Sequence, residues 1–332
     1  MRFAVLGDGA WGTAVATLLL NNGHDVTLWG PFPDYIETMK QAGKNIKFLP
    51  ILALPSRLRL TSNINEAVDN AEVLIIALPS QYVRNLFNLL RPIINTKKHI
   101  ILDLAKGIEI GTLKRVSEIV SEILGDVNYS VLSGPSHAEE VCKNIPTAVV
   151  IGTKNRETGT LLQNAFINEN FRVYLSDDPT GVELGGALKN VYAIAAGIAD
   201  GMGIGDNPKA ALITRSIAEM SRLGKALGGR YETFSGLSGI GDLIVTCISK
   251  HSRNRAVGEK LGKGLSLEQI LKELGMVVAE GVTTTESAYK LVTKHGIEAP
   301  IVCELYETLY KGKNPKECLS DLMNREAKTE IY

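Results

Sequence analysis

Two lysines and an aspartate, far apart in the chain, have the side chains best suited to chemistry. Lys106 follows an apolar run that predicts a buried strand, Lys189 lies among small apolar residues, and Asp242 lies in a predicted helix. A lysine kept from water must find a partner or lose its proton, which makes its amine a useful acid or base. We therefore predict that Lys189 exchanges a proton, that Asp242 orients it, and that Lys106 holds an anionic substrate.

Each of these side chains also has a simpler interpretation. Lys106 could reach solvent, Lys189 could extend to water from a helix edge, and Asp242 could offset the dipole of its helix. Thr246 follows Asp242 by one helical turn, so its hydroxyl lies on the same face and could bind substrate or cofactor. His137 stands at a predicted helix start, where capping or packing is favoured over base catalysis.

The segment Ser252-Arg253-Asn254-Arg255 is a candidate phosphate site. An arginine offers paired donors for phosphate oxygens, and serine and asparagine add neutral donors. The segment precedes a predicted helix, whose first N–H groups would add to the attraction. Such a cluster is usually a solvated turn, but this chain has no net basic bias that would explain it.

The start of the chain has the order strand, glycine turn, helix. An apolar run is followed by Gly7-Asp-Gly9-Ala-Trp-Gly12 and then by a helical pattern. In this context G-x-G-x-x-G predicts dinucleotide binding, because Gly7 makes the turn, Gly9 admits a pyrophosphate and Gly12 lets helix and strand pack. The N–H groups of the first helical turn, at Ala10 and Trp11, would face the anion. The alternative is a glycine-rich turn without a ligand.

These residues must be positioned by a sheet that alternates with helices. Near-continuous apolar strands separated by helical segments are typical of a doubly wound, mainly parallel sheet with both faces covered. Ligands of such folds bind beyond the carboxyl ends of the strands, where the loops that carry Ser80, Lys106 and Ser136 would converge. The predicted strands are 2–6, 25–29, 57–60, 71–77, 100–104, 129–132, 147–152 and 171–174, the predicted helices are 10–21, 34–40, 65–69, 81–90 and 114–124, and residues 45–60 are otherwise irregular.

After residue 180 the pattern becomes helical, and no strand is predicted. Alanine and glycine at helical spacing over 181–201 predict a long helix that is buried on most sides. We predict a Rossmann-like dinucleotide-binding domain over residues 1–180 and an all-helical substrate-binding domain over residues 181–332. The further predicted helices are 210–227, 237–248, one capped by Ser266, 284–295, 301–310 and 315–322.

Charge balance and cysteine spacing exclude several kinds of protein. The 332 residues carry 36 basic and 36 acidic side chains, so no nucleic-acid or membrane-surface partner is expected. The four cysteines are widely spaced, which disfavours a zinc site or a disulfide framework. Cys247 has apolar neighbours and no obvious base nearby, so we expect it to pack in a core. Neither a signal peptide nor a membrane-spanning run is recognised, and we expect a soluble, cytoplasmic protein.

Together these segments resemble the bacterial-type NAD(P)-dependent glycerol-3-phosphate dehydrogenases. The matching segments occur in the order of the family and cover most of the chain. The lysine segment and the Ser-Arg-Asn segment are the specific ones, since the glycine fingerprint is shared by many dehydrogenases. The segments are GDGAWG at 7–12, KG at 106–107, SGPSHAE at 133–139, GALKN at 186–190, GIGD at 239–242, SRN at 252–254 and EG at 280–281.

The resemblance implies reversible hydride transfer between nicotinamide C4 and C2 of glycerol 3-phosphate or dihydroxyacetone phosphate. It implies that Lys189 is the proton donor or acceptor, that Lys106 contacts substrate and cofactor, and that Asp242 lies in the substrate site. It also implies a role in glycerophospholipid synthesis and a cytoplasmic homodimer. Further substrate contacts are implied for Gly134, Ser136, Ser252, Arg253 and Asn254, and cofactor contacts for Trp11, Ala138, Arg253, Val278 and Glu280.

One segment departs from the family pattern. Many members have an arginine after the second strand that can meet the 2′-phosphate of NADP, whereas this chain reads Gly30-Pro-Phe-Pro-Asp34. With neither an arginine nor an acid directly at the strand end, the usual rule does not choose between the cofactors. The expected cofactor is therefore NAD or NADP. Asp34 could turn back toward the ribose or simply begin a helix.

Two other functions remain open from the residues alone. One is a related two-domain dehydrogenase that acts on another hydroxy acid or on a nucleotide sugar, the latter with a catalytic cysteine. The other is a nucleotide-binding sensor without turnover, against which the lysine pair argues. The sequence does not give the oligomeric state, feedback control or kinetic direction.

Overall fold

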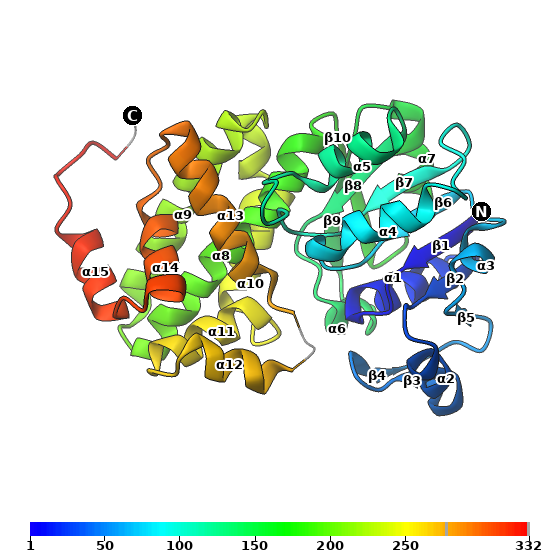
Figure 1. Cartoon of the computed structure of the whole chain (residues 1–332), viewed down its shortest axis with the longest axis horizontal. Helices are drawn as coiled ribbons and strands as arrows, with labels where there is room; N and C mark the ends of the chain where they lie inside the picture. Colours follow the sequence, from blue (N-terminus) through cyan, green and yellow to red (C-terminus); the bar gives the residue numbers. More distant parts are fainter. Residues whose placement is uncertain (276–277, 331–332) are drawn as a thin grey trace.

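The molecule has two parts that lie side by side, a sheet flanked by helices and a bundle of helices (Figure 1). The computed structural model describes residues 1–275 and 278–330. The sheet part is coloured blue to green in Figure 1, and the yellow-to-red segments lie in the bundle. The predicted architecture, a Rossmann-like sheet followed by helices, is confirmed.

The main sheet has eight strands in the order β10-β9-β8-β7-β6-β1-β2-β5. Neighbouring strands are parallel except β8 and β9, so the sheet is mainly parallel, as predicted. The strand order reverses at β1, which lies between β2 and β6, and ligands of doubly wound sheets bind at such a point. The strands are β1 (Arg2–Leu6), β2 (Asp25–Trp29), β5 (Arg59–Thr61), β6 (Val73–Ile76), β7 (Ile100–Asp103), β8 (Asn128–Ser133), β9 (Thr147–Thr153) and β10 (Phe171–Ser176).

Both faces of the sheet are covered, which is why its central strands β1, β6 and β7 are apolar at nearly every position. Along β1, Phe3 and Val5 belong to one core, whereas Ala4 and Leu6 belong to the other. This alternation follows from strand geometry, since successive side chains point to opposite faces. The helices of this part are α1 (Ala10–Asn21), α2 (Pro33–Ala42), α3 (Ile64–Val68), α4 (Val83–Leu90), α5 (Val116–Leu124), α6 (Ala138–Val141) and α7 (Arg156–Phe166), with a short 3₁₀ turn, η1 (Ser80–Tyr82).

Two segments of the sheet part differ from the prediction. The stretch predicted to be irregular contains a two-stranded antiparallel ribbon, β3 (Lys44–Asn45) and β4 (Leu49–Ala53). The predicted strand 57–60 lies later, at β5. Pro50 obscures the pattern of β4, although proline is tolerated in a ribbon of this kind, which has free edges.

Helix α7 was not predicted from the sequence. Its buried residues include Thr158, Leu162 and Phe166, which recur one turn apart and face the sheet core. Gly159 and the polar residues around it lower the helical propensity of the segment. Tertiary packing, together with a cap by Asn155, whose side chain accepts from the N–H of Thr158, therefore outweighs local preference.

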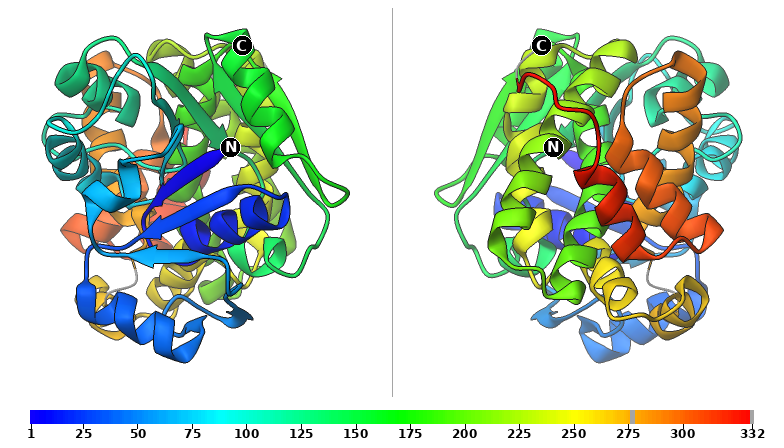
Figure 2. Two further views of the ribbon diagram at one scale, coloured as in Figure 1. Left: turned by 90° about the vertical axis from the view of Figure 1, so that its right-hand side faces the viewer. Right: turned by 90° about the vertical axis from the view of Figure 1, so that its left-hand side faces the viewer.

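The second part is built around α8 (Pro179–Met202), the long helix predicted over 181–201. Helices α9, α10, α11 and α13 pack against it, and it passes through the middle of the bundle in Figures 1 and 2. The approach of α11 is close, because a Cβ added at Gly258 would lie 1.9 Å from the carbonyl oxygen of Ile194. The remaining helices are α9 (Asp206–Ala226), η2 (Tyr231–Ser235), η3 (Leu237–Gly241), α10 (Asp242–Ile248), α11 (Arg253–Gly262), α12 (Leu267–Leu274), α13 (Glu280–His295), α14 (Pro300–Lys311) and α15 (Pro315–Met323).

The predicted helix 237–248 consists of two pieces. A π-helical turn, η3, precedes the α-helix α10, and Asp242 is the first residue of α10. Such turns are often found at functional sites. Ser266 caps α12, as predicted. Within residues 1–275 and 278–330, none of the helices combines the length and hydropathy of a membrane span.

Candidate active site

A cavity of about 260 Å³ lies where the carboxyl ends of the central strands meet the helical part. The sheet side contributes the turn after β1 and the loops after β6, β7 and β8, and the helical side contributes α8, α10 and α11. Loops far apart in the sequence thus converge on one crevice. Its lining includes many predicted site residues: Gly9, Ala10, Trp11, Lys106, Ser136, Ala138, Lys189, Thr246, Ser252, Arg253, Asn254, Val278 and Glu280.

The glycine turn leaves the start of α1 open to the cavity. Gly9 is the N-cap of α1 and, within the described residues, no side chain bonds to the first N–H groups of the helix. Those groups are donors that suit a pyrophosphate. Gly7 and Gly12 do not line the cavity but permit the turn, since Gly7 has φ 137° and a Cβ at Gly12 would lie 2.0 Å from the carbonyl oxygen of Gly7. The residues present therefore fit a dinucleotide.

The two lysines share one buried carboxylate. Lys106 Nζ lies 2.6 Å from Asp242 Oδ2, and Lys189 Nζ lies 3.0 Å from Asp242 Oδ1. The Asp242 side chain is 2% exposed and that of Lys189 is 8% exposed. The structure therefore brings together the three groups that the sequence placed far apart, and neither lysine simply reaches solvent.

Neutral groups complete the setting of the lysines. Lys189 Nζ donates to Thr246 Oγ1 at 2.8 Å, and that hydroxyl donates to the carbonyl oxygen of Asp242 at 2.6 Å. Lys106 Nζ donates to the carbonyl oxygen of Gly134 at 3.2 Å. Gly134 and Asp242 thus act from behind the cavity wall, through the lysines, rather than as lining residues.

Burial lowers the pKa of Lys189 below its ordinary value, and the nearby charge of Lys106 lowers it further, while Asp242 opposes both. For Asp242, burial alone would raise the pKa, but the charges of Lys106 and Lys189 outweigh it and hold the pKa below its usual value. The amine of Lys189 is therefore easier to deprotonate than that of an exposed lysine, whereas Asp242 stays ionised. This is the electrostatic setting of an acid–base group.

Arg253 is the cation of the SRNR segment that remains available for an anion. Within residues 1–275 and 278–330, its guanidinium makes no hydrogen bond or ion pair, and it lines the cavity. Arg255, in contrast, bonds to Asp200 at 2.6 Å. Ser252 caps α11, and its hydroxyl accepts from the N–H of Arg255. The segment is therefore not a solvated turn.

Asn254 is tied into the scaffold of the site. Its Nδ2 donates to Asn190 Oδ1 at 2.8 Å, and its Oδ1 accepts from the N–H of Gly281 at 2.9 Å. Asn190 Nδ2 in turn donates to the carbonyl oxygen of Lys106 at 2.9 Å. Sequence reasoning missed Asn190, although its place beside Lys189 was a signal. This chain of amides links α8, α11 and α13 to the lysine loop.

Two further predicted residues join the walls of the cavity. Glu280, at the start of α13, accepts from the N–H of Ser80 at 2.6 Å, and burial raises its pKa. Ser136 donates to the carbonyl oxygen of Gly134 at 2.9 Å. Ala138 is the first residue of α6 and lines the cavity beside Trp11, as does Val278.

His137 lines the same cavity, and of the two roles expected for it, capping and packing, side-chain capping is not observed. It is the N-cap residue of α6, yet its side chain makes no capping bond, and Nε2 is buried with no partner among the described residues. Its ring lies 5.9 Å from that of His251. Burial lowers the pKa of His137, and the charge of Lys189 adds to this effect, so the imidazole is neutral. Packing is the role that it has.

None of the four cysteines is among the described residues that line this cavity. All four are free, and burial raises the pKa of the Cys247 thiol to about 12, so this side chain packs in the helical core as predicted. The described residues contain no cluster of His, Cys, Asp and Glu that could hold a metal ion.

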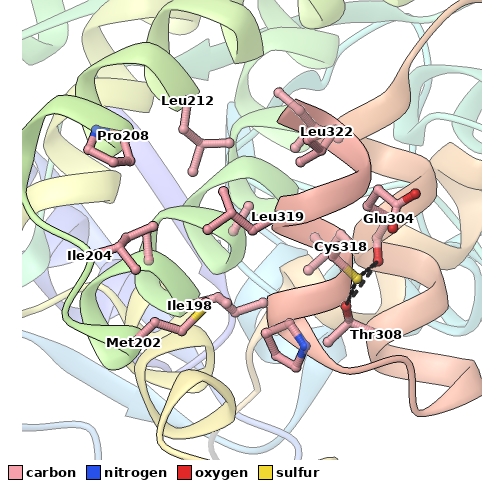
Figure 3. Close-up of a pocket in the computed structure, with 15 residues that line it drawn as sticks. Ile198, Met202, Ile204, Pro208, Leu212, Glu304, Thr308, Cys318, Leu319 and Leu322 are labelled. Atoms are coloured by element: carbon pink, nitrogen blue, oxygen red, sulfur yellow. Dashed lines mark hydrogen bonds between the residues drawn. The ribbon is translucent and has the colours of Figure 1, made fainter. Parts of the chain in front are cut away.

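A second cavity, between α8, α9, α14 and α15, has a different character (Figure 3). Its walls are mostly apolar, with Leu212, Leu319 and Leu322 around it. Glu304 is its one ionisable carboxyl among the described residues that line it, and Cys318 Sγ lies 3.1 Å from Thr308 Oγ1. It offers no cation for a phosphate, so the polar cavity at the sheet is the candidate active site.

Fold and site define a class, that of dehydrogenases in which a helical part closes over the nucleotide edge of a Rossmann-like sheet. Two family descriptions match the chain: "NAD-dependent glycerol-3-phosphate dehydrogenase N-terminus" over residues 2–159 and "C-terminus" over residues 178–320. The chain belongs to the NAD-dependent glycerol-3-phosphate dehydrogenase family.

Individual relatives are similar in sequence to this protein along its whole length. Glycerol-3-phosphate dehydrogenase [NAD(P)+] of Thermoanaerobacter sp. (strain X514) is 50% identical, over 100% of this chain and 99% of its own length. The protein of the same name from Fusobacterium nucleatum is 48% identical, over 100% and 99%. The crystal structure of glycerol-3-phosphate dehydrogenase from Coxiella burnetii superposes with a TM-score of 0.94 at 36% identity and covers 98% of this chain and 99% of that one.

Proposed function

We propose that this protein catalyses the reversible NAD(P)H-dependent reduction of dihydroxyacetone phosphate to sn-glycerol 3-phosphate. The observation that carries the proposal is that Lys106 and Lys189, joined by Asp242, line one cavity with the open start of α1 and with Arg253, whose guanidinium has no partner within residues 1–275 and 278–330. The relatives that match over the full length are named for this reaction.

The dinucleotide would lie along the turn at Gly9, Ala10 and Trp11, with Ala138, Val278 and Glu280 further along its path. The N–H groups at the start of α1 would hold its pyrophosphate. When bound, the reduced nicotinamide supplies the hydride. Lys106, which lines the cavity from the loop after β7, would contact both the ring and the substrate.

The substrate would lie between the lysines and Arg253. Arg253 would hold the phosphate with its paired donors, with help from the start of α11. Ser252 and Asn254 fix the backbone around Arg253, since their side chains are already engaged in capping and cross-linking bonds. Ser136 and the backbone at Gly134 complete the substrate wall.

Lys189 would donate a proton to the carbonyl oxygen at C2 during reduction. The N–H bond of the ammonium breaks, the new O–H bond forms, and the amine that remains is neutral. Asp242 and Thr246 hold that amine in place throughout. The charge of Asp242 also raises the pKa of Lys189 against the effect of burial. In oxidation the neutral amine would accept the proton from the C2 hydroxyl.

We also infer the organisation around this chemistry. Residues 1–180 would act as the dinucleotide-binding domain and residues 181–332 as the helical substrate-binding domain. The protein would work in the cytoplasm as a homodimer and supply glycerol 3-phosphate for glycerophospholipid synthesis. The family resemblance supports each of these points, and light scattering on the purified protein tests the dimer.

A substrate panel tests the proposed reaction. The purified protein is offered NADH or NADPH with dihydroxyacetone phosphate, with unphosphorylated dihydroxyacetone, with a 2-keto acid or, in the oxidised form, with a nucleotide sugar. We expect rapid nucleotide oxidation with dihydroxyacetone phosphate. Turnover of a keto acid or a nucleotide sugar alone, or nucleotide binding without any turnover, would contradict the proposal.

A further inference from the structure

The residue after β2, whose side chain usually contacts the adenosine ribose in such folds, is a glycine in this protein. In dinucleotide-binding folds an acid at the end of the second strand bonds to the ribose 2′-hydroxyl, or an arginine there meets a 2′-phosphate. Here β2 ends at Trp29 and is followed by Gly30. Asp34 belongs to the first turn of α2 and is exposed, so it does not turn back toward the sheet.

A carboxyl group from the glycine turn occupies the space that a side chain at residue 30 would need. A Cβ added at Gly30 would lie 2.5 Å from Asp8 Oδ2 and 2.6 Å from Asp8 Cγ. Asp8 is the residue between Gly7 and Gly9. The acid therefore reaches the end of β2 from β1, the neighbouring strand.

In the part of the chain that the structure describes, one oxygen of this carboxyl group, Oδ2, lacks the hydrogen-bond partner that a buried acid normally has. Asp8 is 6% exposed, and its Oδ2 is buried with no hydrogen-bond partner among the described residues. Burial raises the pKa of Asp8, and the hydrogen bond from its own backbone N–H and the charge of Lys47 only partly offset the effect. Buried acceptors are nearly always satisfied, so one that remains open beside a ligand site points to a donor from the ligand.

The backbone of Asp8 is held firmly. Asn45 Nδ2 donates to the carbonyl oxygen of Asp8 at 2.7 Å and to Thr13 Oγ1 at 2.8 Å. Tyr35 in turn donates to Asn45 Oδ1 at 2.6 Å. Asn45 comes from the β3–β4 ribbon, which thereby clamps the glycine turn. The ammonium of Lys47 lies 5.2 Å from the centre of the Tyr35 ring.

We infer that Asp8 makes this site selective for NAD(H) over NADP(H). Its carboxyl group accepts a hydrogen bond from the ribose 2′-hydroxyl and repels a 2′-phosphate at the same place. The inference rests on the proposed function, because it presumes that the dinucleotide lies along the glycine turn. Residues 30–34 do not distinguish NAD(H) from NADP(H). Asp8 would do so both by attracting the ribose hydroxyl of NAD(H) and by repelling the 2′-phosphate of NADP(H).

The test measures the dissociation constants of NADH and NADPH by nicotinamide fluorescence, without substrate, for the wild-type protein, Asp8→Asn and Asp8→Ala. We expect the wild type to bind NADH at least about tenfold more tightly than NADPH, and both variants to lose most of that ratio, since the Asp8 carboxylate and the 2′-phosphate are like charges that repel each other. Asp34→Asn is the matched control, because it removes an exposed carboxylate from the first turn of α2, shortly after the end of β2, and the ratio should not change.

A rescue variant makes the test sharper. Asp8→Ala with Gly30→Asp moves the carboxylate to the strand end and should restore the preference for NADH. The truncation removes the Asp8 carboxyl from that space, and only the flexible end of Ile36, with Cδ1 2.9 Å from the added Cβ, has to shift. Unchanged ratios in both Asp8 variants, or a wild-type preference for NADPH that Lys47→Ala abolishes, would overturn the inference while leaving the reaction intact. Failure of the wild-type protein to bind either nucleotide would overturn the proposed function and this inference together.

Discussion

Asp242 has one negative charge and two cationic neighbours. A single carboxylate cannot neutralise both ammonium groups, so the cluster stays positive while Lys106 and Lys189 keep their protons. Arg253, which forms no ion pair with the part of the chain that the structure describes, adds a further charge to the same cavity. Such an excess suits a substrate with a phosphate group, and it makes the role of each cation separable by experiment.

Arg253→Ala should weaken substrate binding selectively. The KM for dihydroxyacetone phosphate is expected to rise at least about thirtyfold, or about 2 kcal/mol, because a partly buried phosphate loses its charge partner. Steady-state kinetics on the purified variant measure this change.

Unphosphorylated dihydroxyacetone provides the control for Arg253→Ala. Its kcat/KM, which does not depend on a phosphate contact, should change little. An unaltered KM for dihydroxyacetone phosphate would show that the phosphate is held elsewhere.

Asp242→Asn should shift the pH profile of reduction. The charge of Asp242 raises the pKa of Lys189 against the effect of burial, so its removal lowers that pKa further. Reduction needs the protonated amine, and its rate therefore falls as pH rises through the pKa of Lys189. The falling limb of the kcat profile is expected to move to lower pH in the variant. A limb that stays in place or moves to higher pH would argue against Lys189 as the titrating group.

At the scale of elements, the central strands were predictable because both faces of the sheet are buried. Val73 to Ile76 of β6 is an unbroken apolar run, which indicates a covered parallel strand. The direction of β9 was not predictable, since an apolar run such as that around Val149 is the same in either direction. Helix α7 and the β3–β4 ribbon were missed because long-range contacts, such as that of Asn45 with the glycine turn, hold them.

In the site, too, features with a local sequence pattern were predictable and features that depend on long-range contacts were not. Lys189 and the SRN segment were recognisable from local pattern, and their convergence followed from strand ends meeting at one edge. The orphaned carboxyl of Asp8 and the amide chain through Asn190 depend on contacts between distant elements, which one sequence does not reveal. Both lie next to residues that were recognised.

The start of α14 depends on a buried acid from α9. Glu219 accepts from the N–H groups of Ile301, at 2.8 Å, and Val302, at 3.4 Å. Burial raises the pKa of Glu219 from 4.5 to about 7. A raised folded-state pKa gives a stability contribution that is fully present below pH 4.5, the unfolded value, and is lost as pH rises to about 7.

Glu219→Gln should remove this pH dependence. Between mildly acidic and mildly alkaline pH, the wild-type protein is expected to lose of the order of 3 kcal/mol of its free energy of unfolding through Glu219. The variant should not show this loss. Urea unfolding of both proteins at the two pH values gives the comparison. A difference between the proteins that does not change with pH would refute the assignment.

At the scale of the whole molecule, the reaction depends on two parts meeting. The sheet part offers the glycine turn and Lys106, and the helical part offers Lys189, Asp242 and Arg253. Lys189 lies on α8, and the helices that carry Asp242 and Arg253, α10 and α11, pack on it, so the helical core holds the proposed proton donor as one unit. A change at Lys189 should therefore act on the chemistry without disturbing the nucleotide site on the sheet.

The most direct test of the account is Lys189→Ala, measured for nucleotide binding and for turnover in the same preparation. We expect NADH to bind with a dissociation constant close to that of the wild type, and kcat with dihydroxyacetone phosphate to fall by about 10²–10⁴, the range for loss of a general acid. Wild-type turnover in this variant would contradict the claim that Lys189, held by Asp242, passes the proton.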